Sequence, residues 1–277
     1  MRSRKVSSIE QVAVHGLLII WLLISVIPFV WMVSTSFKGP GEIYIFPPRW
    51  IPKNPTLNNY IDLFQEMNFG RPFLNSVIVS LSTTFLSVLV ATMAGYGFAK
   101  FRFKNKNLLF LFILGTIMVP GQITMIPVFL LLSRLNLLNT YLGLILPAIA
   151  NAFNIFFMRQ YIMSIPDELI EAAKMDGAHE GWIFFRIILP LARPAMAAIT
   201  IFTFTGAWNS FLWPLILATD ESMYTLPVAV SVLQGQYGEN IAMQMAGSVI
   251  VILPLIIVFL LTQRYFIKGI TFTGMKV

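Results

Sequence analysis

The chain has 277 residues, of which 57% are hydrophobic and 11% are charged. Soluble domains carry about 25% charged residues, so this composition excludes an ordinary soluble domain, and its apolar content excludes an intrinsically disordered chain. Cysteine is absent, which excludes disulfides, thiolate metal sites and cysteine nucleophiles. With only two histidines, His15 and His179, the sequence argues against a histidine-rich metal centre.

Six stretches of 24 to 28 residues contain no Asp, Glu, Lys or Arg. In chain order they are 11–37, 72–99, 107–133, 135–158, 194–219 and 240–263. A helix needs about 20 mostly apolar residues to cross a bilayer core, and continuously apolar runs favour helices over barrel strands. The sequence therefore predicts an all-α membrane protein with six transmembrane helices. The first apolar stretch is longer than a signal-peptide core and no A-x-A site follows it, so we expect a retained first helix.

Lysine and arginine are unequally divided between the segments that join these runs. Fourteen of the nineteen lie in the two terminal tails and in the links 100–106 and 159–193, whereas five lie in the segments of the opposite side. Basic residues are retained on the cytoplasmic side of a membrane, so this split predicts cytoplasmic N- and C-termini. Topology thus accounts for the net charge of +7, and no nucleic-acid partner is expected.

The outer segment 34–72 and the prolines inside the runs each allow two interpretations. The segment is rich in proline and aromatic residues, which predicts a loop along the membrane interface, with contact to an external partner as the alternative. Prolines within the runs predict kinked helix packing, because proline removes a backbone hydrogen bond. A gating hinge is the alternative, and it fits best at Pro120-Gly121 and Pro127 in the third run.

The segment 164–194 is too polar to span a membrane and begins with the pattern of a short helix. Pro166 suits a helix start, and Asp167 and Glu168 complement the positive N-terminal end of a helix. Apolar residues then share one face at i, i+4, i+7 and i+8: Ile165, Leu169, Ala172 and Ala173. This shallow face either docks into a groove on a partner or packs against the chain's own helices.

A turn and a second helix are predicted to follow. Asp176-Gly177 is a break signal, and Gly177 tolerates the positive φ that reverses a chain. We expect the second helix to be short, running from about His179 to Leu189 and ending at Pro190.

The same segment resembles the EAA loop of binding-protein-dependent ABC importer permeases. Glu171-Ala172-Ala173 is followed after three residues by Gly177, after nine more by Ile187, and then by Leu189-Pro190. Five anchored elements over 20 residues make this pattern specific. Further segments resemble the smaller maltose-type permease of the carbohydrate-uptake branch: Ser36-Phe37-Lys38, Asn59-Tyr60, Phe73-Leu74-Asn75-Ser76, Gly95-Tyr96-Gly97-Phe98-Ala99-Lys100-Phe101, Trp208-Asn209 and Tyr265-Phe266-Ile267-Lys268-Gly269-Ile270-Thr271.

The resemblance implies a type I ABC importer permease fold with cytoplasmic EAA coupling helices, in a bacterial or archaeal plasma (inner) membrane. Residues 1–69 would form the N-terminal tail, first transmembrane helix and outer loop, 70–265 the permease core, and 266–277 a cytoplasmic C-terminal tail. The implied partners are a second permease subunit, two copies of a cytoplasmic ABC ATPase, an external substrate-binding protein and the lipid bilayer.

A transport subunit rather than an enzyme is expected. No lysine is followed by Ser or Thr, so the chain lacks a Walker A motif. No cofactor or metal is expected in this chain, and the resemblance places ATP and Mg²⁺ in the partner ATPase. It implies that Glu171 makes a polar contact to the ATPase, the alanines allow close approach, Gly177 sets the turn and Asp176 caps or braces it. The implied coupling set is Leu169, Glu171, Ala172, Ala173, Asp176 and Gly177.

A sugar is the substrate that the resemblance implies, and several intramembrane side chains are candidates to contact it. They offer hydrogen-bonding groups or aromatic faces: Asn151, Asn154, Trp208, Asn209 and Trp213. Each could instead make an interhelical hydrogen bond or anchor a helix at the interface. Glycerol 3-phosphate or a polyol is the alternative substrate. A secondary carrier, a channel and a membrane enzyme are the alternative classes; the EAA loop argues against the first two, and the charge-free spans argue against the third.

Overall fold

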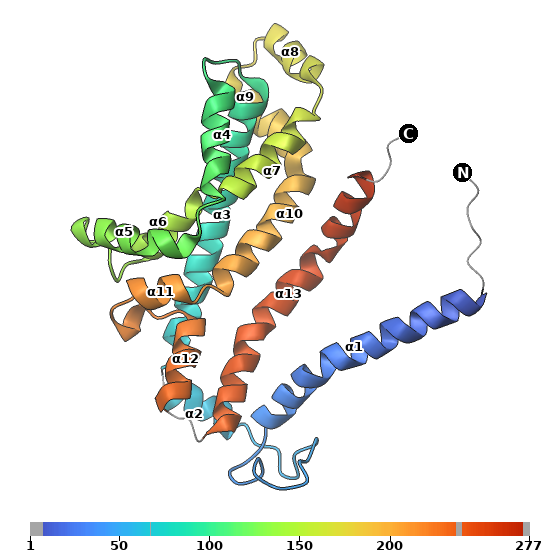
Figure 1. Ribbon diagram of the computed structural model, residues 1–277, viewed down its shortest axis with the longest axis vertical. Coiled ribbons are helices and arrows are strands. Elements are labelled where there is room, and N and C mark those ends of the chain that lie inside the picture. The colour runs from blue at the N-terminus through green and yellow to red at the C-terminus, as the bar shows by residue number, and fades with distance from the viewer. Residues whose placement is uncertain (1–7, 67, 237–239, 274–277) are drawn as a thin grey trace. The chain divides into compact units, whose positions relative to one another are not determined.

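The computed structural model describes residues 8–66, 68–236 and 240–273, and every regular element within these ranges is a helix (Figure 1). The described residues divide into two compact units. Unit 1 comprises the residues up to Phe69 together with 230–252, and unit 2 comprises 70–229 together with the residues from Leu253. The predicted division of the chain at 69 and 265 stays a prediction; within the expected tail 266–277, residues 266–273 continue a helix and the rest lie outside the described residues.

Within the described ranges, four helices are long and apolar enough to cross a membrane, and the number rises to six if each of two bent helix pairs is counted as one span. The four are Glu10–Ser36 of α1 (Ser8–Ser36), α3 (Gly70–Lys100), the helix Glu180–Trp208, and Ile241–Leu260 of α13 (Ile241–Thr273). The pairs are α4 (Lys106–Thr116) with α5 (Gly121–Arg134), and α6 (Tyr141–Ile149) with α7 (Ala152–Met163). The predicted all-α membrane fold is confirmed.

Both bent pairs break near a proline. α4 and α5 meet at 99°, and Pro120, which has no backbone N–H to donate, directly precedes α5. α6 and α7 meet at 46°, three residues after Pro147. These bends agree with kinked packing, whereas a gating role for Pro120 stays a prediction.

The second loop helix does not end at Pro190, so that prediction is wrong. α9 (Glu180–Ile183), the π-helical turn η1 (Phe184–Ile188) and α10 (Leu189–Trp208) form one continuous helix. The N–H of Leu189 donates to the carbonyl five residues back, and this wider turn relieves the clash that a proline ring makes with the carbonyl four residues before it. The expected span 194–219 is displaced accordingly: it starts earlier and ends at Trp208, before α11 (Leu212–Leu217).

The core of unit 2 is built on α3, which packs against α7 and α10 (Figure 1). Close approach of α3 to α7 depends on Gly95, where a Cβ atom would lie 2.8 Å from the Cβ of Met158 and 2.9 Å from the backbone nitrogen of Arg159. Small residues at helix interfaces allow such contacts in membranes. Met158 is fully buried as a result.

The start of α3 is fixed by the segment before α12 (Leu226–Gln236). Asn75 donates to the carbonyls of Ser222 and Tyr224 at 2.8 and 2.9 Å, and the hydroxyl of Ser76 accepts from the N–H of Leu226 at 2.7 Å. Ser222 belongs to the 3-10 turn η2 (Glu221–Met223). Asn75 and Ser76 belong to a segment that resembles the maltose-type permease. Their side chains anchor a connection that lies about 150 residues later in the chain.

In unit 1, two further segments that resemble the maltose-type permease, 36–38 and 59–60, meet at the end of α1. Asn59, in α2 (Asn58–Glu66), donates to the carbonyls of Ser36 and Lys38 at 2.9 Å each, and the hydroxyls of Ser36 and Tyr60 lie 2.7 Å apart. Lys38 is buried with its ammonium 3.8 Å from the ring centre of Trp31. Burial lowers the pKa of Lys38, and nearby Glu42 opposes this shift. These contacts close the loop between α1 and α2.

Candidate coupling surface and transport path

The predicted loop helix is α8 (Asp167–Met175), which lies beyond one end of the α3–α7–α10 core (Figure 1). Pro166 precedes it with an extended ψ of 136°, and Asp167 and Glu168 occupy its first turn. These residues suit a helix start for two reasons. Proline has no backbone N–H that would be left unpaired at this position, and carboxylates are stabilised by the positive N-terminal end of the helix dipole. Ile170 and Ala173 turn inward and join the hydrophobic core of unit 2.

The outward face of α8 differs from the predicted apolar face. Of the four predicted residues, Ile165 and Ala173 are buried in the chain's own core, whereas Leu169 is 45% exposed and Ala172 is also exposed. The inward packing of Ala173 is the alternative that the sequence left open. Met175, which sequence reasoning missed, is 90% exposed. Its position three residues after Ala172 was the available signal, since helical residues at i and i+3 are neighbours.

Asp167 and Lys174 of α8 are exposed but ion-paired, and we call the other exposed residues of this helix the coupling face. It consists of Glu168, Leu169, Glu171, Ala172 and Met175. The face combines two carboxylates, one small residue and two flexible apolar side chains. This is a surface onto which another protein can lay an apolar groove with basic residues at its edges.

Gly177 terminates α8 through a Schellman motif. Its φ is +82°, the N–H of Ala178 donates to the carbonyl of Ala173 at 2.9 Å, and the N–H of Gly177 donates to the carbonyl of Lys174 at 3.0 Å. These two bonds satisfy carbonyls that the helix end would otherwise leave unpaired. Asp176 is the C-cap residue, but its exposed carboxylate makes no hydrogen bond or ion pair to the described part of the chain. Gly177 therefore sets the turn as predicted from its conformational freedom, and Asp176 contributes its backbone.

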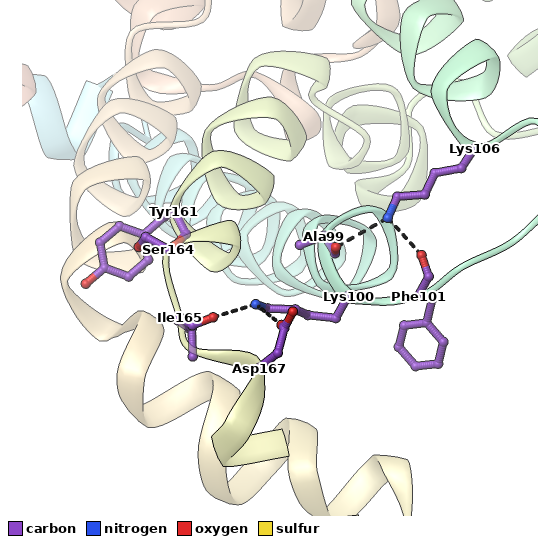
Figure 2. A network of polar contacts seen from close by, with 8 residues as sticks. All are labelled: Ala99, Lys100, Phe101, Lys106, Tyr161, Ser164, Ile165 and Asp167. Carbon is purple, nitrogen blue, oxygen red and sulfur yellow. Dashed lines mark hydrogen bonds and ion pairs between the residues drawn. The ribbon is translucent and has the colours of Figure 1, made fainter. Parts of the chain in front are cut away.

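A lysine at the end of α3 holds the start of α8 (Figure 2). The ammonium of Lys100 donates to the carbonyl of Ile165 and forms an ion pair with Asp167. Only 8% of the Lys100 side chain is exposed, against 71% for Asp167. The hydrogen bond and charge of Lys100 hold the pKa of Asp167 below its usual value. The pair thus joins a membrane-spanning helix directly to the coupling helix.

A second polar link joins α3 to the other end of α8. The hydroxyl of Tyr96 donates to Glu180 Oε2 at 2.9 Å, and Lys174 Nζ lies 2.6 Å from Glu180 Oε1. Glu180 is the first residue of α9, so its carboxylate bridges α3, α8 and the helix that continues into the membrane. Together, the two links fix both ends of α8 to α3.

We expect Asp167→Asn to reduce uptake without reducing the amount of chain in the membrane, because the amide keeps one acceptor for Lys100 but loses its charge. The defect should be equal at about pH 5.5 and pH 7.5. The pKa of Asp167 is lowered on folding, so its contribution is complete above the usual value of 3.8 and is lost only as pH falls through the lowered value. Uptake assays at both pH values test this, with Asp176→Asn as the matched loss of one exposed carboxylate that has no partner among the described residues. A defect confined to the lower pH would contradict it.

The two predicted asparagines of the transport path lie together but serve the fold. Asn151 is the N-cap of α7 and accepts from the N–H of Asn154 at 3.0 Å. The amide of Asn154 is buried and donates to Ser87 of α3 at 3.2 Å and to Thr203 of α10 at 2.9 Å. Asn154 therefore makes the interhelical hydrogen bonds that were the alternative to sugar contact.

The remaining path candidates are dispersed. Trp208 is 2% exposed and packs against Phe204 and Phe73, with ring centres 5.7 and 6.3 Å away. Asn209 is exposed as the C-cap of α10. Trp213 is half-buried and lines a cavity of about 120 Å³ between α3, α6 and the break that follows α10.

This cavity contains polar groups that sequence reasoning missed. Thr83 and Ser210 line it beside Trp213, and no Asp, Glu, Lys or Arg lines it. The Thr83 hydroxyl is buried and has no hydrogen-bond partner among the described residues. Buried hydroxyls are normally paired, so the hydroxyl of Thr83, unpaired within the described ranges, is an exception, in a residue that lines the cavity. The only sequence signal was an adjacent pair of threonines in a charge-free run.

Comparison with known proteins decides the family. A family model described as "binding-protein-dependent transport system inner membrane component" matches residues 87–272. The chain belongs to this family. The matched region contains α8, Gly177 and both polar links from α3. The EAA pattern and the coupling face therefore both lie within the part of the chain that matches the family.

Two curated relatives and one solved structure extend the similarity to nearly the whole chain. An arabinooligosaccharide transport system permease of Halalkalibacterium halodurans is 41% identical over 91% of this chain and 92% of its own length. A diacetylchitobiose uptake system permease of Streptomyces coelicolor is 36% identical over 90% and 84%. A chain of a bacterial ABC transporter that imports the acidic polysaccharide alginate matches with a TM-score of 0.85 and 25% identity, covering 96% of this chain and 99% of that one. The fold is therefore that of an ABC importer permease, a membrane transport component.

Proposed function

We propose that the chain is one of two permease subunits of an ATP-driven importer and forms, with the second, a path for a neutral sugar or oligosaccharide. The similarity to oligosaccharide permeases over nine-tenths of the chain carries this proposal. An external binding protein delivers the sugar, and two copies of a cytoplasmic ATPase supply the energy, because the chain has no Walker A motif. The termini and the 164–194 segment then lie in the cytoplasm, as the distribution of basic residues favours.

In this proposal the coupling face of α8 contacts the ATPase. Glu171 and Glu168 offer carboxylates to basic side chains, and Leu169 and Met175 enter an apolar groove. When ATP closes the ATPase dimer, α8 moves, and the Lys100 and Glu180 links carry the movement to α3. Both ends of α8 are fixed to the same membrane helix, so its displacement tilts that helix instead of bending the loop.

We propose that a hydroxyl or hydroxymethyl group of the sugar enters the cavity that Thr83, Ser210 and Trp213 line. A cavity of about 120 Å³ has room for a small polar group of a sugar. Thr83 and Ser210 offer hydroxyls, and Trp213 offers an aromatic face. A glycerol 3-phosphate would bring two negative charges to a cavity whose lining has no cation, which favours a neutral sugar.

We expect Thr83→Val to lower the kcat/KM of sugar uptake by about threefold to tenfold, the range for loss of one neutral hydrogen bond. Thermal stability should stay the same or rise, because valine keeps the shape and removes an unpaired buried hydroxyl. Thr84→Val is the matched control, since the Thr84 hydroxyl is already bonded to the carbonyl of Ser80 at 2.6 Å. The two variants are compared by uptake of labelled oligosaccharides into membrane vesicles. Full uptake activity of Thr83→Val would show that this residue is not part of the transport path.

The proposed assembly and orientation can be tested together, because the natural chain has no cysteine. A single cysteine in place of exposed Lys104 should react with a membrane-impermeant maleimide only after the cells are opened. A single cysteine in place of exposed Arg49 should react in cells whose inner membrane is intact, provided that the reagent can pass the outer envelope. Gentle extraction of the tagged chain should recover an ATPase and a second permease. Recovery of the chain alone, still active in uptake, would favour a secondary carrier or channel instead.

A further inference from the structure

A basic pocket opens where the link after α3 enters α4. It has a volume of about 460 Å³, and Arg102, Asn105, Lys106, Leu108 and Arg159 contribute to its lining. Three of its lining side chains are cationic and none is a carboxylate. Ala99 and Lys106, which line the pocket, lie near Lys100 at the end of α3 (Figure 2), and in the proposed orientation this end is at the cytoplasmic surface of the membrane.

The pocket's cations are positioned without being neutralised. Lys106 donates to the carbonyls of Ala99 and Phe101 at 3.3 and 2.8 Å (Figure 2), and Arg159 donates to the carbonyl of Phe98 at 3.2 Å. These acceptors are neutral, so the positive charges remain uncompensated. Arg102 is exposed and has no ion pair within the described ranges.

The beginning of α4 adds hydrogen-bond donors to the same pocket. Asn105 is the N-cap in a left-handed conformation, with φ 62°, and its side chain makes no capping hydrogen bond. Asn107 and Leu108, in the first turn, both line the pocket. First-turn N–H groups of a helix lack partners within the helix and favour an anion such as phosphate.

An apolar groove continues from the basic pocket along α4. Its volume is about 280 Å³, it is lined by Leu108, Leu111, Phe112, Gly115, Thr116 and Val119, and it shares Leu108 with the pocket. At 1.5 Å per residue, the helical part from Leu108 to Thr116 spans about 12 Å, most of the half-thickness of a bilayer core. A side chain at Gly115 would meet no other atom within 4 Å, so the groove has open space at that point.

From this juxtaposition we propose that the chain binds one anionic phospholipid of the cytoplasmic leaflet, with its phosphate in the basic pocket and an acyl chain in the groove along α4. The proposal rests on the orientation given under the proposed function. Cationic pockets at the cytoplasmic side of membrane helices attract anionic headgroups, and the adjoining groove requires a ligand with a hydrocarbon chain. Free phosphate would fill the pocket but leave the groove empty.

The test uses the assembled transporter, stripped of lipid in detergent and titrated with dioleoyl phosphatidylglycerol while native mass spectrometry counts bound lipid. Arg102→Gln should weaken phosphatidylglycerol binding about fivefold, the effect of one basic residue near a lipid surface. Lys104→Gln is the matched control, because Lys104 has the same charge and exposure but does not line the pocket, and its affinity should equal that of the natural chain. Gly115→Leu should also weaken binding by filling the groove, with assembly of the complex unchanged.

Phosphatidylcholine should bind at least fivefold more weakly than phosphatidylglycerol, and millimolar inorganic phosphate should not displace the lipid. Equal binding by Arg102→Gln and Lys104→Gln would overturn the proposal. So would complete competition by phosphate combined with normal binding by Gly115→Leu, which would assign the pocket to a free anion. The readout is lipid binding, so loss of sugar uptake does not affect it, and labelling at position 104 separately decides the orientation.

Discussion

Replacing Gly177 with valine is expected to abolish uptake while leaving the chain inserted in the membrane. The φ of +82° is available to glycine at no cost, but it costs an ordinary L-residue about 1–2 kcal/mol and a β-branched residue more. A Cβ at this position would meet no atom within 4 Å, so the effect acts through the backbone alone. Relaxing φ breaks the hydrogen bond from Ala178 to Ala173 and releases the end of α8, which alters the coupling face.

Two substitutions at the same position separate backbone conformation from side-chain volume. Gly177→Asn should keep most of the uptake, because asparagine tolerates the left-handed region, and Gly177→Ala should be intermediate. Measurements of uptake, of chain in the membrane and of co-purified ATPase distinguish loss of coupling from loss of insertion. Valine and asparagine variants with equal uptake would show that the turn does not control coupling.

Features set by neighbouring residues were predictable from the sequence. Pro166, Asp167 and Glu168 define the start of α8, and Gly177 defines its end, because proline geometry, the helix dipole and the left-handed conformation all act within a few residues. The charge-free runs similarly predicted the membrane helices, since the cost of burying a charge in lipid depends little on the fold.

Features that depend on distant packing were not predictable. Periodicity placed Leu169 and Ala173 on one broad face, but only the packing of α8 on the core of unit 2 decides that Ala173 is covered and Met175 is exposed. Pro190 was predicted to end a helix, yet the π turn before it lets the helix continue. The cavity beside Thr83 forms where α3 meets two broken helices, and no local pattern marks a threonine whose hydroxyl lacks a partner.

The asparagines show how the same residue type can fit two interpretations. Asn154 was a candidate sugar contact because its amide offers hydrogen bonds, and an interhelical hydrogen bond was the alternative. The structure supplies that bonding through Ser87 and Thr203, on two other helices. A satisfied amide lies at the centre of the α3–α7–α10 core, whereas the unsatisfied hydroxyl of Thr83 lies at a cavity. The sequence does not reveal which of these polar groups is hydrogen-bonded within the fold, and a role of Thr83 in the path stays a proposal.

The contact between α3 and α7 leads to the second large expected effect. Gly95→Leu should strongly reduce the amount of folded chain, because the Cβ alone would lie 2.8 Å from Met158 and 2.9 Å from a backbone nitrogen. Backbone cannot rotate away as a flexible side chain can, so the two helices must separate. Overpacking of a core costs about 1–3 kcal/mol, and enforced separation also strains the bond from Asn154 to Ser87.

Gly97→Leu provides the matched control within the same three-residue segment, since a Cβ at Gly97 meets no atom within 4 Å. Thermal unfolding of the purified transporter and the level of chain in the membrane should fall for Gly95→Leu and stay near the natural values for Gly97→Leu. The two links from α3 to α8 leave the helix at Tyr96, between the two glycines, and at Lys100, three residues after Gly97, so both variants disturb the same region of sequence. An equal loss of stability and of membrane level in both variants would mean that glycine is needed there for coupling or flexibility. A larger loss in Gly95→Leu would mean that Gly95 allows the close packing of α3 on α7.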